Sequence, residues 1–293
     1  MRRLFFASAA LLMACVAGPA FAQAPSASSE DPIVVEGQRG TEDRPTVVTK
    51  LRRMIEESSG DQLARFENEI CPVVIGMPAD WTAILTRIIR ENIVAAGGKV
   101  GRESCSVNAA AIFIDQPQEL LRALNKEEPS FFMNMSPREF DQFSGPRRAA
   151  YSWHTMNTYT KDGVHMDKVS RFASATRLYT NIREEMESGL VVIDRRATIG
   201  KSLRQLADFT TMHLMLDVNW RSPHMDRSSI LSLFHSHDDG PPLRMSSFDR
   251  NALSGFYLQR ENSRTADQQR QNIARSIERQ EAGKPAVGTK KED

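Results

Sequence analysis

The segment from Gly200 to Tyr257 constrains the fold more than any other part of the sequence. It opens with a helical pattern that is apolar on almost every side, formed by Leu203, Leu206, Ala207, Phe209, Met212, Leu214, Met215 and Leu216. A helix that is apolar all round is buried in a protein core. The same segment carries Asp208, His213 and Asp217, and buried ionisable groups are costly unless they are paired or bind a ligand. We therefore expect a central buried helix whose ionisable residues have a defined role.

Two motifs follow this helix. They are Ser229-Ile230-Leu231 and Met245-Ser246-Ser247-Phe248-Asp249-Arg250-Asn251-Ala252-Leu253, the second with Tyr257 four residues later. The layout resembles the zincin metallopeptidases, in particular the metzincins, whose active-site helix reads H-E-x-x-H-x-x-G-x-x-H/D. In that family a turn of S-I-M type and a helix of L-S-x-F-D-x-x-A-L-x-x-L-Y type come next. The resemblance implies an α+β fold, with a zincin-like mixed sheet and a central buried helix under a cleft.

The metal-ligand motif of that family is lost here. When this helix is aligned with the family motif, Ala207 and Thr211 stand at the two histidine positions. Asp208 stands at the glutamate position and Asp217 at the third-ligand position. Zinc in such a site needs two imidazoles one helical turn apart and a third ligand. The resemblance therefore implies a degenerate zincin domain, and we expect no cofactor.

The first 22 residues have the pattern of a secretory signal peptide. Arg2 and Arg3 precede an apolar run, and Ala20-Phe21-Ala22 is an A-x-A cleavage site. The run is too short to span a membrane, and no later stretch approaches the ~20 apolar residues of a span. We expect an exported protein, periplasmic or secreted. Leu12 to Cys15 also resembles a lipoprotein signal, in which Cys15 would be lipidated, but the A-x-A site favours ordinary cleavage after Ala22.

The net charge of the chain shows no excess of basic residues of the kind that indicates nucleic-acid binding. Lys and Arg number 38 and Asp and Glu 37, so the net charge is +1, and it becomes −1 once Arg2 and Arg3 are removed.

Residues 23–45 are expected to form a linker. We expect residues 46–262 to form a single zincin-like α+β domain, followed by a polar C-terminal helix and tail at 263–293.

Cys71 and Cys105 are the two cysteines that remain after signal cleavage. An even pair in an exported protein indicates one disulfide, which would contribute ~3–4 kcal/mol in the chain-entropy model. The alternatives are two free buried thiols and, less favoured, zinc binding by two isolated cysteines. Uncharacterised secreted proteins of proteobacteria have a similar pair of cysteines and a similar C-terminal end, a resemblance that implies no known function.

The middle of the chain predicts a β-α-β opening. Strands are expected at 71–76 and 109–115, with helices at 78–97 and 117–127. In the first of these helices the predicted buried stripe consists of Trp81, Ile84, Leu85, Ile88 and Ile89.

Helices are further expected at 46–58, from Ser136-Pro137 onward and at 264–282. Strands at 147–160, 169–180 and 190–195 precede the central helix, as a zincin requires. In that family the edge strand lies along the cleft and could pair with an extended peptide.

The histidines allow two interpretations. His235 and His237 alternate along the chain, so both imidazoles could reach one metal if this segment were extended. We favour a solvent-facing loop that ends at Gly240-Pro241-Pro242. His213 is interpreted as a satisfied, buried or half-buried histidine, and His154 has no partner that the sequence reveals.

Two functional hypotheses follow, because the sequence contains no P-loop, G-x-G-x-x-G or G-x-S-x-G motif. The first is a non-catalytic exported protein that binds a peptide, another protein or an envelope component. The second is a metal-dependent, peptidase-like hydrolase with rearranged ligands, in which Asp208, His213 and Asp217 combine with His235 and His237 and zinc is the cofactor. A purely structural envelope component is a third possibility.

Overall fold

The structure is a computed structural model that describes residues 44–160, 163–166, 182–222, 226–235, 240–259 and 264–283. All of these residues belong to one compact unit, Gly40–Asp293. The predicted signal peptide, Cys15, His237 and the expected strand at 169–180 lie outside the described residues.

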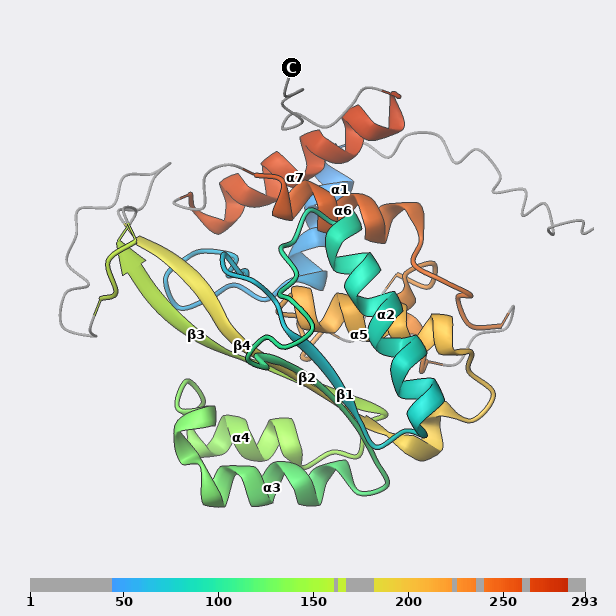
Figure 1. Ribbon diagram of the computed structural model, residues 1–293. Coiled ribbons are helices and arrows are strands. Elements are labelled where there is room, and N and C mark those ends of the chain that lie inside the picture. Colours follow the sequence, from blue (N-terminus) through green and yellow to red (C-terminus); the bar gives the residue numbers. More distant parts are fainter. Residues whose placement is uncertain are drawn as a thin grey trace, which may run out of the picture. The chain divides into compact units, whose positions relative to one another are not determined.

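A four-stranded mixed sheet forms the centre of this unit (Figure 1). Its strands are β1 (Pro72–Ile75), β2 (Ala109–Ile114), β3 (Ala150–Thr160) and β4 (Ile182–Asp194), in the order β1-β2-β4-β3. β2 pairs in parallel with β1 and β4, whereas β3 runs antiparallel to β4. The helix α2 (Ala79–Ala95) connects β1 to β2, as the β-α-β pattern predicts. The expected α+β architecture with a mixed sheet is confirmed.

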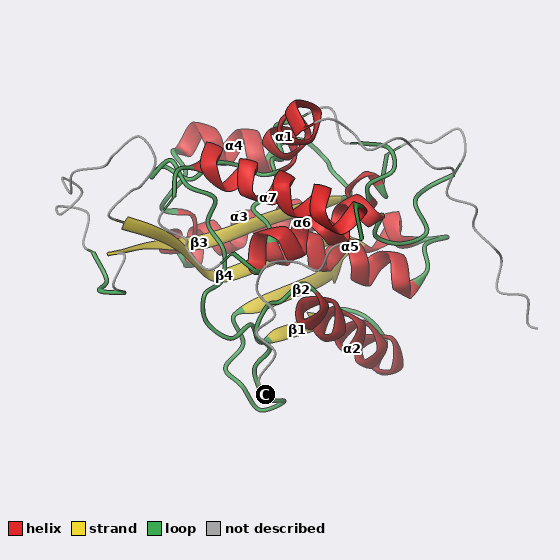
Figure 2. Ribbon diagram, turned by 90° about the horizontal axis from the view of Figure 1, so that it is seen from above, coloured by secondary structure: helices red, strands yellow, loops and turns green. Residues whose placement is uncertain are grey.

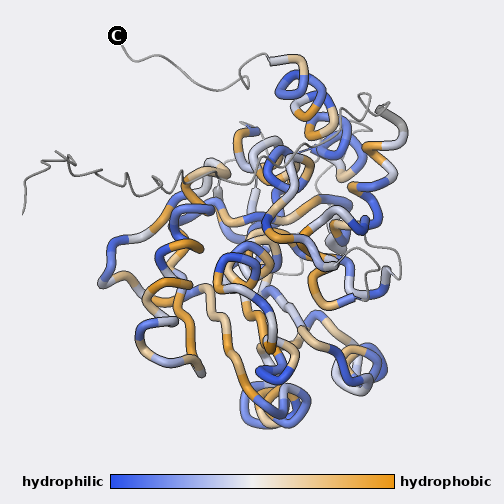
Figure 3. Tube along the Cα trace, turned by 90° about the vertical axis from the view of Figure 1, so that its right-hand side faces the viewer, coloured by the Kyte–Doolittle hydropathy of each residue, from blue (hydrophilic) through white to orange (hydrophobic). Residues whose placement is uncertain are grey.

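Helices cover both faces of the sheet because its strands are apolar on both sides (Figures 1 and 2). One core contains α2 together with α1 (Arg44–Met54), α5 (Leu203–Met215), α6 (Ser247–Tyr257) and α7 (Ala266–Glu281). The other contains α3 (Pro117–Glu127), η1 (Pro129–Phe132) and α4 (Pro137–Ser144). Successive residues of a strand point to opposite faces, so Ala109, Ala111 and Phe113 enter the first core while Ala110 and Ile112 face the second. In Figure 3, hydrophobic stretches (orange) alternate with hydrophilic ones (blue) along the chain.

Local signals define the ends of several elements. The helices α4, α5 and α6 each begin with a capping box, from Ser136, Ser202 and Ser246 respectively. Gly76 ends β1 with a φ of +88°, and a Cβ at this position would lie 2.0 Å from the carbonyl oxygen of Phe113. Only glycine fits this turn, which directs the chain from β1 into α2.

Some details of the sequence prediction are wrong. The strand expected at 190–195 is β4, which already begins at Ile182. The first helix ends at Met54 rather than Ser58, because Ile55 pairs with Val218 instead of continuing the helix. In α2, Trp81 and Ile84 are 50% and 37% exposed, and the buried stripe consists of Leu85, Ile88, Ile89 and Ile93. At the start of α2, Ala79 and Asp80 are exposed as well, so the first turn of this helix faces outward.

The C-terminal helix α7 packs laterally on α1 and α6. Ile273 and Ile277 are fully buried, and the buried Arg270 pairs with Glu57 and Asp267. Among the described residues, no helix combines the length and apolar character needed to cross a membrane.

Candidate functional site

The central helix α5 is buried along almost its whole length, as its sequence predicts. The positions that would hold the zincin motif are occupied by Ala207, Asp208 and Thr211, and each of these residues is 0% exposed. Thr211 donates its hydroxyl to the carbonyl oxygen of Ala207 at 2.8 Å. This face of α5 therefore packs inside the protein and is not open to a substrate.

Asp208 is held by three partners from three parts of the chain. Its Oδ1 accepts a hydrogen bond from Asn92 Nδ2 on α2 at 2.9 Å and pairs with Arg204 Nε at 2.9 Å. Its Oδ2 accepts from the backbone nitrogen of Met245 at 2.9 Å, just before α6. A buried carboxylate with this set of donors is satisfied. Asp208 thus connects α5 to α2 and to the segment that enters α6.

Asp217 lies beyond the end of α5 and faces β3. Its Oδ1 is 3.6 Å from Nδ1 of His154, whose side chain is fully buried. The other ring nitrogen of His154, Nε2, lies 3.0 Å from the carbonyl oxygen of Leu214. A carbonyl only accepts hydrogen bonds, so Nε2 carries a hydrogen. His154 therefore joins β3 to the C-terminal end of α5, although the sequence revealed no partner for it.

Gly189 makes room for this histidine. It is the residue of β4 that lies opposite His154 in the sheet, and a Cβ there would lie 3.1 Å from ring atom Cδ2 and 3.3 Å from Nε2. Nδ1 of His154 has no hydrogen-bond partner. It is a buried ring nitrogen that faces a carboxylate.

His213 is the second histidine at this end of α5. Its Nδ1 forms a 2.9 Å hydrogen bond with Oγ of Ser152, two residues before His154 on β3. Burial, together with the nearby charge of His154, lowers the pKa of His213 to about 3. The imidazole is therefore neutral near neutral pH, in agreement with its interpretation as a satisfied, half-buried histidine.

The lowered pKa of His213 makes stability depend on pH. The unfolded chain takes up a proton near the ordinary pKa of ~6.5, whereas the folded protein does so only near 3. The stabilisation that comes from the neutral His213 is thus complete above about pH 6.5 and is lost as the pH falls toward 3. Because His213 is partly exposed, we expect a loss of about 2 kcal/mol between about pH 7 and about pH 4.5. Urea unfolding across this range measures it.

The matched variants are H213N, which keeps a hydrogen-bonding side chain, and H235N. The slope of stability against pH should flatten in H213N and remain in H235N, because His235 is exposed. Equal slopes in H213N and the wild type would show that folding does not change the pKa of His213.

The candidate metal ligands do not form one cluster in the described part of the chain. No three His, Cys, Asp or Glu side chains there lie close enough together to hold a metal ion. Asp208 is held by α2 and by the segment before α6, whereas His213 and Asp217 face β3. His235 lies on the exposed turn after η4 (Ile230–Ser232). Its predicted companion His237 is outside the described residues.

The two motifs after α5 are joined by Asp249. This buried carboxylate accepts hydrogen bonds from Ser229 Oγ at 2.6 Å and from the backbone nitrogens of Ile230 and Ser246 at 2.9 Å each. Burial raises the pKa of Asp249, and these hydrogen bonds oppose that shift. Asp249 therefore holds the Ser229-Ile230-Leu231 turn against the start of α6.

Sequence reasoning missed the partners of these residues rather than the residues themselves. Asn92 is one polar side chain on an otherwise amphipathic helix, and nothing in its spacing points to Asp208. The sequence did contain a signal for Ser152 and His154. Residues two apart on a strand lie on the same face, so the spacing predicts that these two side chains face the same neighbour, which is α5.

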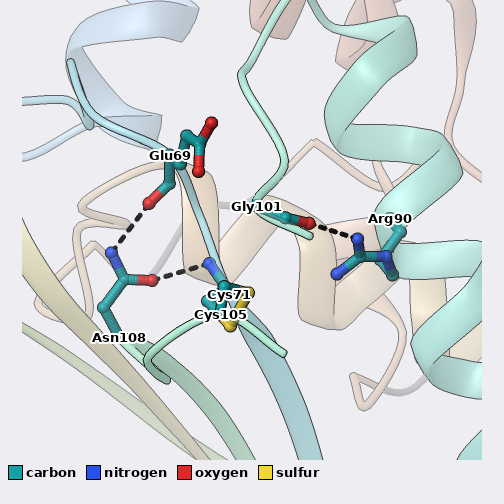
Figure 4. The surroundings of a disulfide bond; sticks show 6 residues. All are labelled: Glu69, Cys71, Arg90, Gly101, Cys105 and Asn108. Atoms are coloured by element: carbon teal, nitrogen blue, oxygen red, sulfur yellow. Dashed lines mark hydrogen bonds between the residues drawn. A yellow bond between two sulfur atoms is a disulfide. The ribbon is translucent and has the colours of Figure 1, made fainter. Parts of the chain in front are cut away.

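The predicted disulfide is present between Cys71 and Cys105, with Cα atoms 5.9 Å apart. Beside it, the side chain of Asn108 accepts from Cys71 N at 2.7 Å and donates to Glu69 O at 3.0 Å (Figure 4). Arg90 on α2 donates to the carbonyl of Gly101 in the same loop. A structural disulfide is typical of proteins from oxidising compartments and fits an exported protein.

Comparisons of this chain with protein-family models, with curated proteins and with solved structures found no match.

Proposed function

We propose that this chain is an exported, non-catalytic protein with a degenerate zincin-like fold and a binding role in the cell envelope. One observation carries the proposal. The motif positions in α5 hold the fully buried residues Ala207, Asp208 and Thr211, and the carboxylate of Asp208 is bound by three partners within the protein. A carboxylate held in this way acts as a structural anchor and is not available to activate water.

The arrangement around α5 supports the zincin-like part of the proposal. β3 is an antiparallel edge strand, and the strand beside it, β4, leads through η3 (Arg195–Thr198) into α5. The turn at Ser229 and the helix α6 follow in the order of the family motifs, and Asp249 joins them.

The edge strand supports the binding role. Within the described residues, Ala150–Asn157 pair with β4 alone, so the other side of this stretch has no strand partner there. An extended peptide can add to such an edge through backbone hydrogen bonds. We therefore place the binding of a peptide, or of an extended segment of another protein, along β3.

The alternative, a metal-dependent hydrolase with rearranged ligands, is favoured by one observation. His154 Nδ1 has no hydrogen-bond partner and lies 3.6 Å from Asp217 Oδ1, a separation compatible with two ligands that are each ~2 Å from one zinc ion. This pair differs from the histidines that the sequence suggested. Further ligands would have to come from water or from outside the described residues.

Metal analysis separates the two functions. We expect the mature protein, purified without a chelator, to contain no stoichiometric zinc and to cleave no peptide in a chelator-sensitive way. Elemental analysis and a peptide-library cleavage assay measure both properties, with D217A and H154Q as variants of the candidate ligand pair. Peptides selected on the immobilised protein should be recovered intact. One equivalent of zinc that is lost in D217A, together with chelator-sensitive cleavage, would replace the binding role with the hydrolase.

A further inference from the structure

Two loops at the N-terminal end of α5 carry the most exposed large apolar side chains of the described chain. Ile199 is 81% exposed and Leu243 is 71% exposed, ahead of Val164 at 65%. Ile199 lies between η3 and α5, and Leu243 follows Pro241-Pro242 in the segment that leads to α6. Neither side chain contributes to a core, so burial within this chain does not explain them.

The side chain of Gln205 holds the two loops together. Its Oε1 accepts a hydrogen bond from Ser202 N at 2.8 Å, and its Nε2 donates to Pro242 O at 2.7 Å. Gln205 is only 4% exposed, so this link is protected from water. The two prolines further restrict the second loop. Ile199 and Leu243 therefore lie on the two loops that Gln205 joins, and we name this surface the α5 tip (residues 199–201 and 242–244).

The α5 tip is positively charged. Lys201 and Arg244 belong to it, and neither forms an ion pair with another described residue. Arg204, one turn into α5, is neutralised by Asp208. Exposed aliphatic side chains beside cations that have no ion pair among the described residues match an anionic bilayer surface, where the apolar groups enter the headgroup region and the cations meet lipid phosphates. A stable protein partner would need a much larger contact area than two side chains provide.

We infer that the protein binds reversibly to anionic membrane surfaces through the α5 tip. The inference rests on the proposed function, because it names a lipid surface as the envelope component that the exported protein binds. Its test is independent of metal, cleavage and peptide binding, so it can fail while the proposed function stands, and the reverse also holds.

Co-sedimentation of the mature protein with vesicles tests the inference. The wild type should bind phosphatidylglycerol vesicles, and raised salt should weaken this binding because salt screens the cations. I199E/L243E should bind roughly tenfold more weakly, and K201E/R244E should lose the preference for phosphatidylglycerol over phosphatidylcholine vesicles. The matched control is V94E, at a 62% exposed position of α2 that does not belong to the tip. Circular dichroism confirms that each variant is folded.

The inference is overturned if the wild type does not bind the vesicles, or if V94E weakens binding as much as I199E/L243E does. Binding that K201E/R244E leaves unchanged would equally overturn the anionic-surface assignment.

Discussion

D208A should lower the free energy of unfolding by about 3–5 kcal/mol, although Asp208 occupies the position of a catalytic glutamate in the family that the sequence resembles. Alanine would leave the buried Met245 N–H and the amide of Asn92 without their acceptor. Arg204 would lose its partner as well, but it is 48% exposed and can be solvated. Urea unfolding should therefore show a midpoint lowered by about 1 M or more, with an unchanged slope.

D217A is the matched control for this prediction. Asp217 occupies the third-ligand position, its side chain is 18% exposed, and its contact with His154 is 3.6 Å long. A partly exposed pair of this kind contributes ~1 kcal/mol or less. D208N should fall between the two variants, because its amide retains one acceptor oxygen. If D217A were the more destabilised variant, the structural anchor would be Asp217 and the interpretation of α5 would have to be reversed.

This contrast shows what the sequence could predict. The central helix was predicted because its apolar residues cover every face, and a buried helix needs no knowledge of its neighbours to be recognised. The helix start at Ser136-Pro137 and the β-α-β opening are also local signals. The exposure of Trp81 was not predictable in this way, since it depends on how α2 packs against the rest of the protein.

The chemistry of the candidate site depends even more on tertiary contacts. Asn92 and Asp208 are 116 positions apart, and His154 meets the end of α5 from β3. No local pattern reports whether a buried carboxylate faces a metal, a solvent channel or an asparagine. The sequence therefore predicted that Asp208, His213 and Asp217 needed an explanation, and the structure supplied a different partner for each of them.

Loss of the disulfide should destabilise the protein by about 3–4 kcal/mol, because Cys71 and Cys105 are 34 positions apart and the bridge restricts the unfolded chain. Thermal and urea unfolding of C71A/C105A measure this loss. Wild-type protein unfolded in the presence of a reductant should lose a similar amount, which separates the effect of the cross-link from that of packing.

The loop closed by Cys71 and Cys105 should keep its folded structure without the disulfide. The side chain of Asn108 holds the chain at Glu69 and Cys71, and Ile70 pairs with Val100. The double variant should therefore keep its native circular dichroism at low temperature, with the loss confined to the unfolding free energy. N108A in the oxidised protein should lower the free energy of unfolding by only about 1–2 kcal/mol, because one part-buried backbone donor, Cys71 N, loses its acceptor. If C71A/C105A were as stable as the wild type, the cross-link would not restrict the unfolded chain, and the disulfide would lose its structural role.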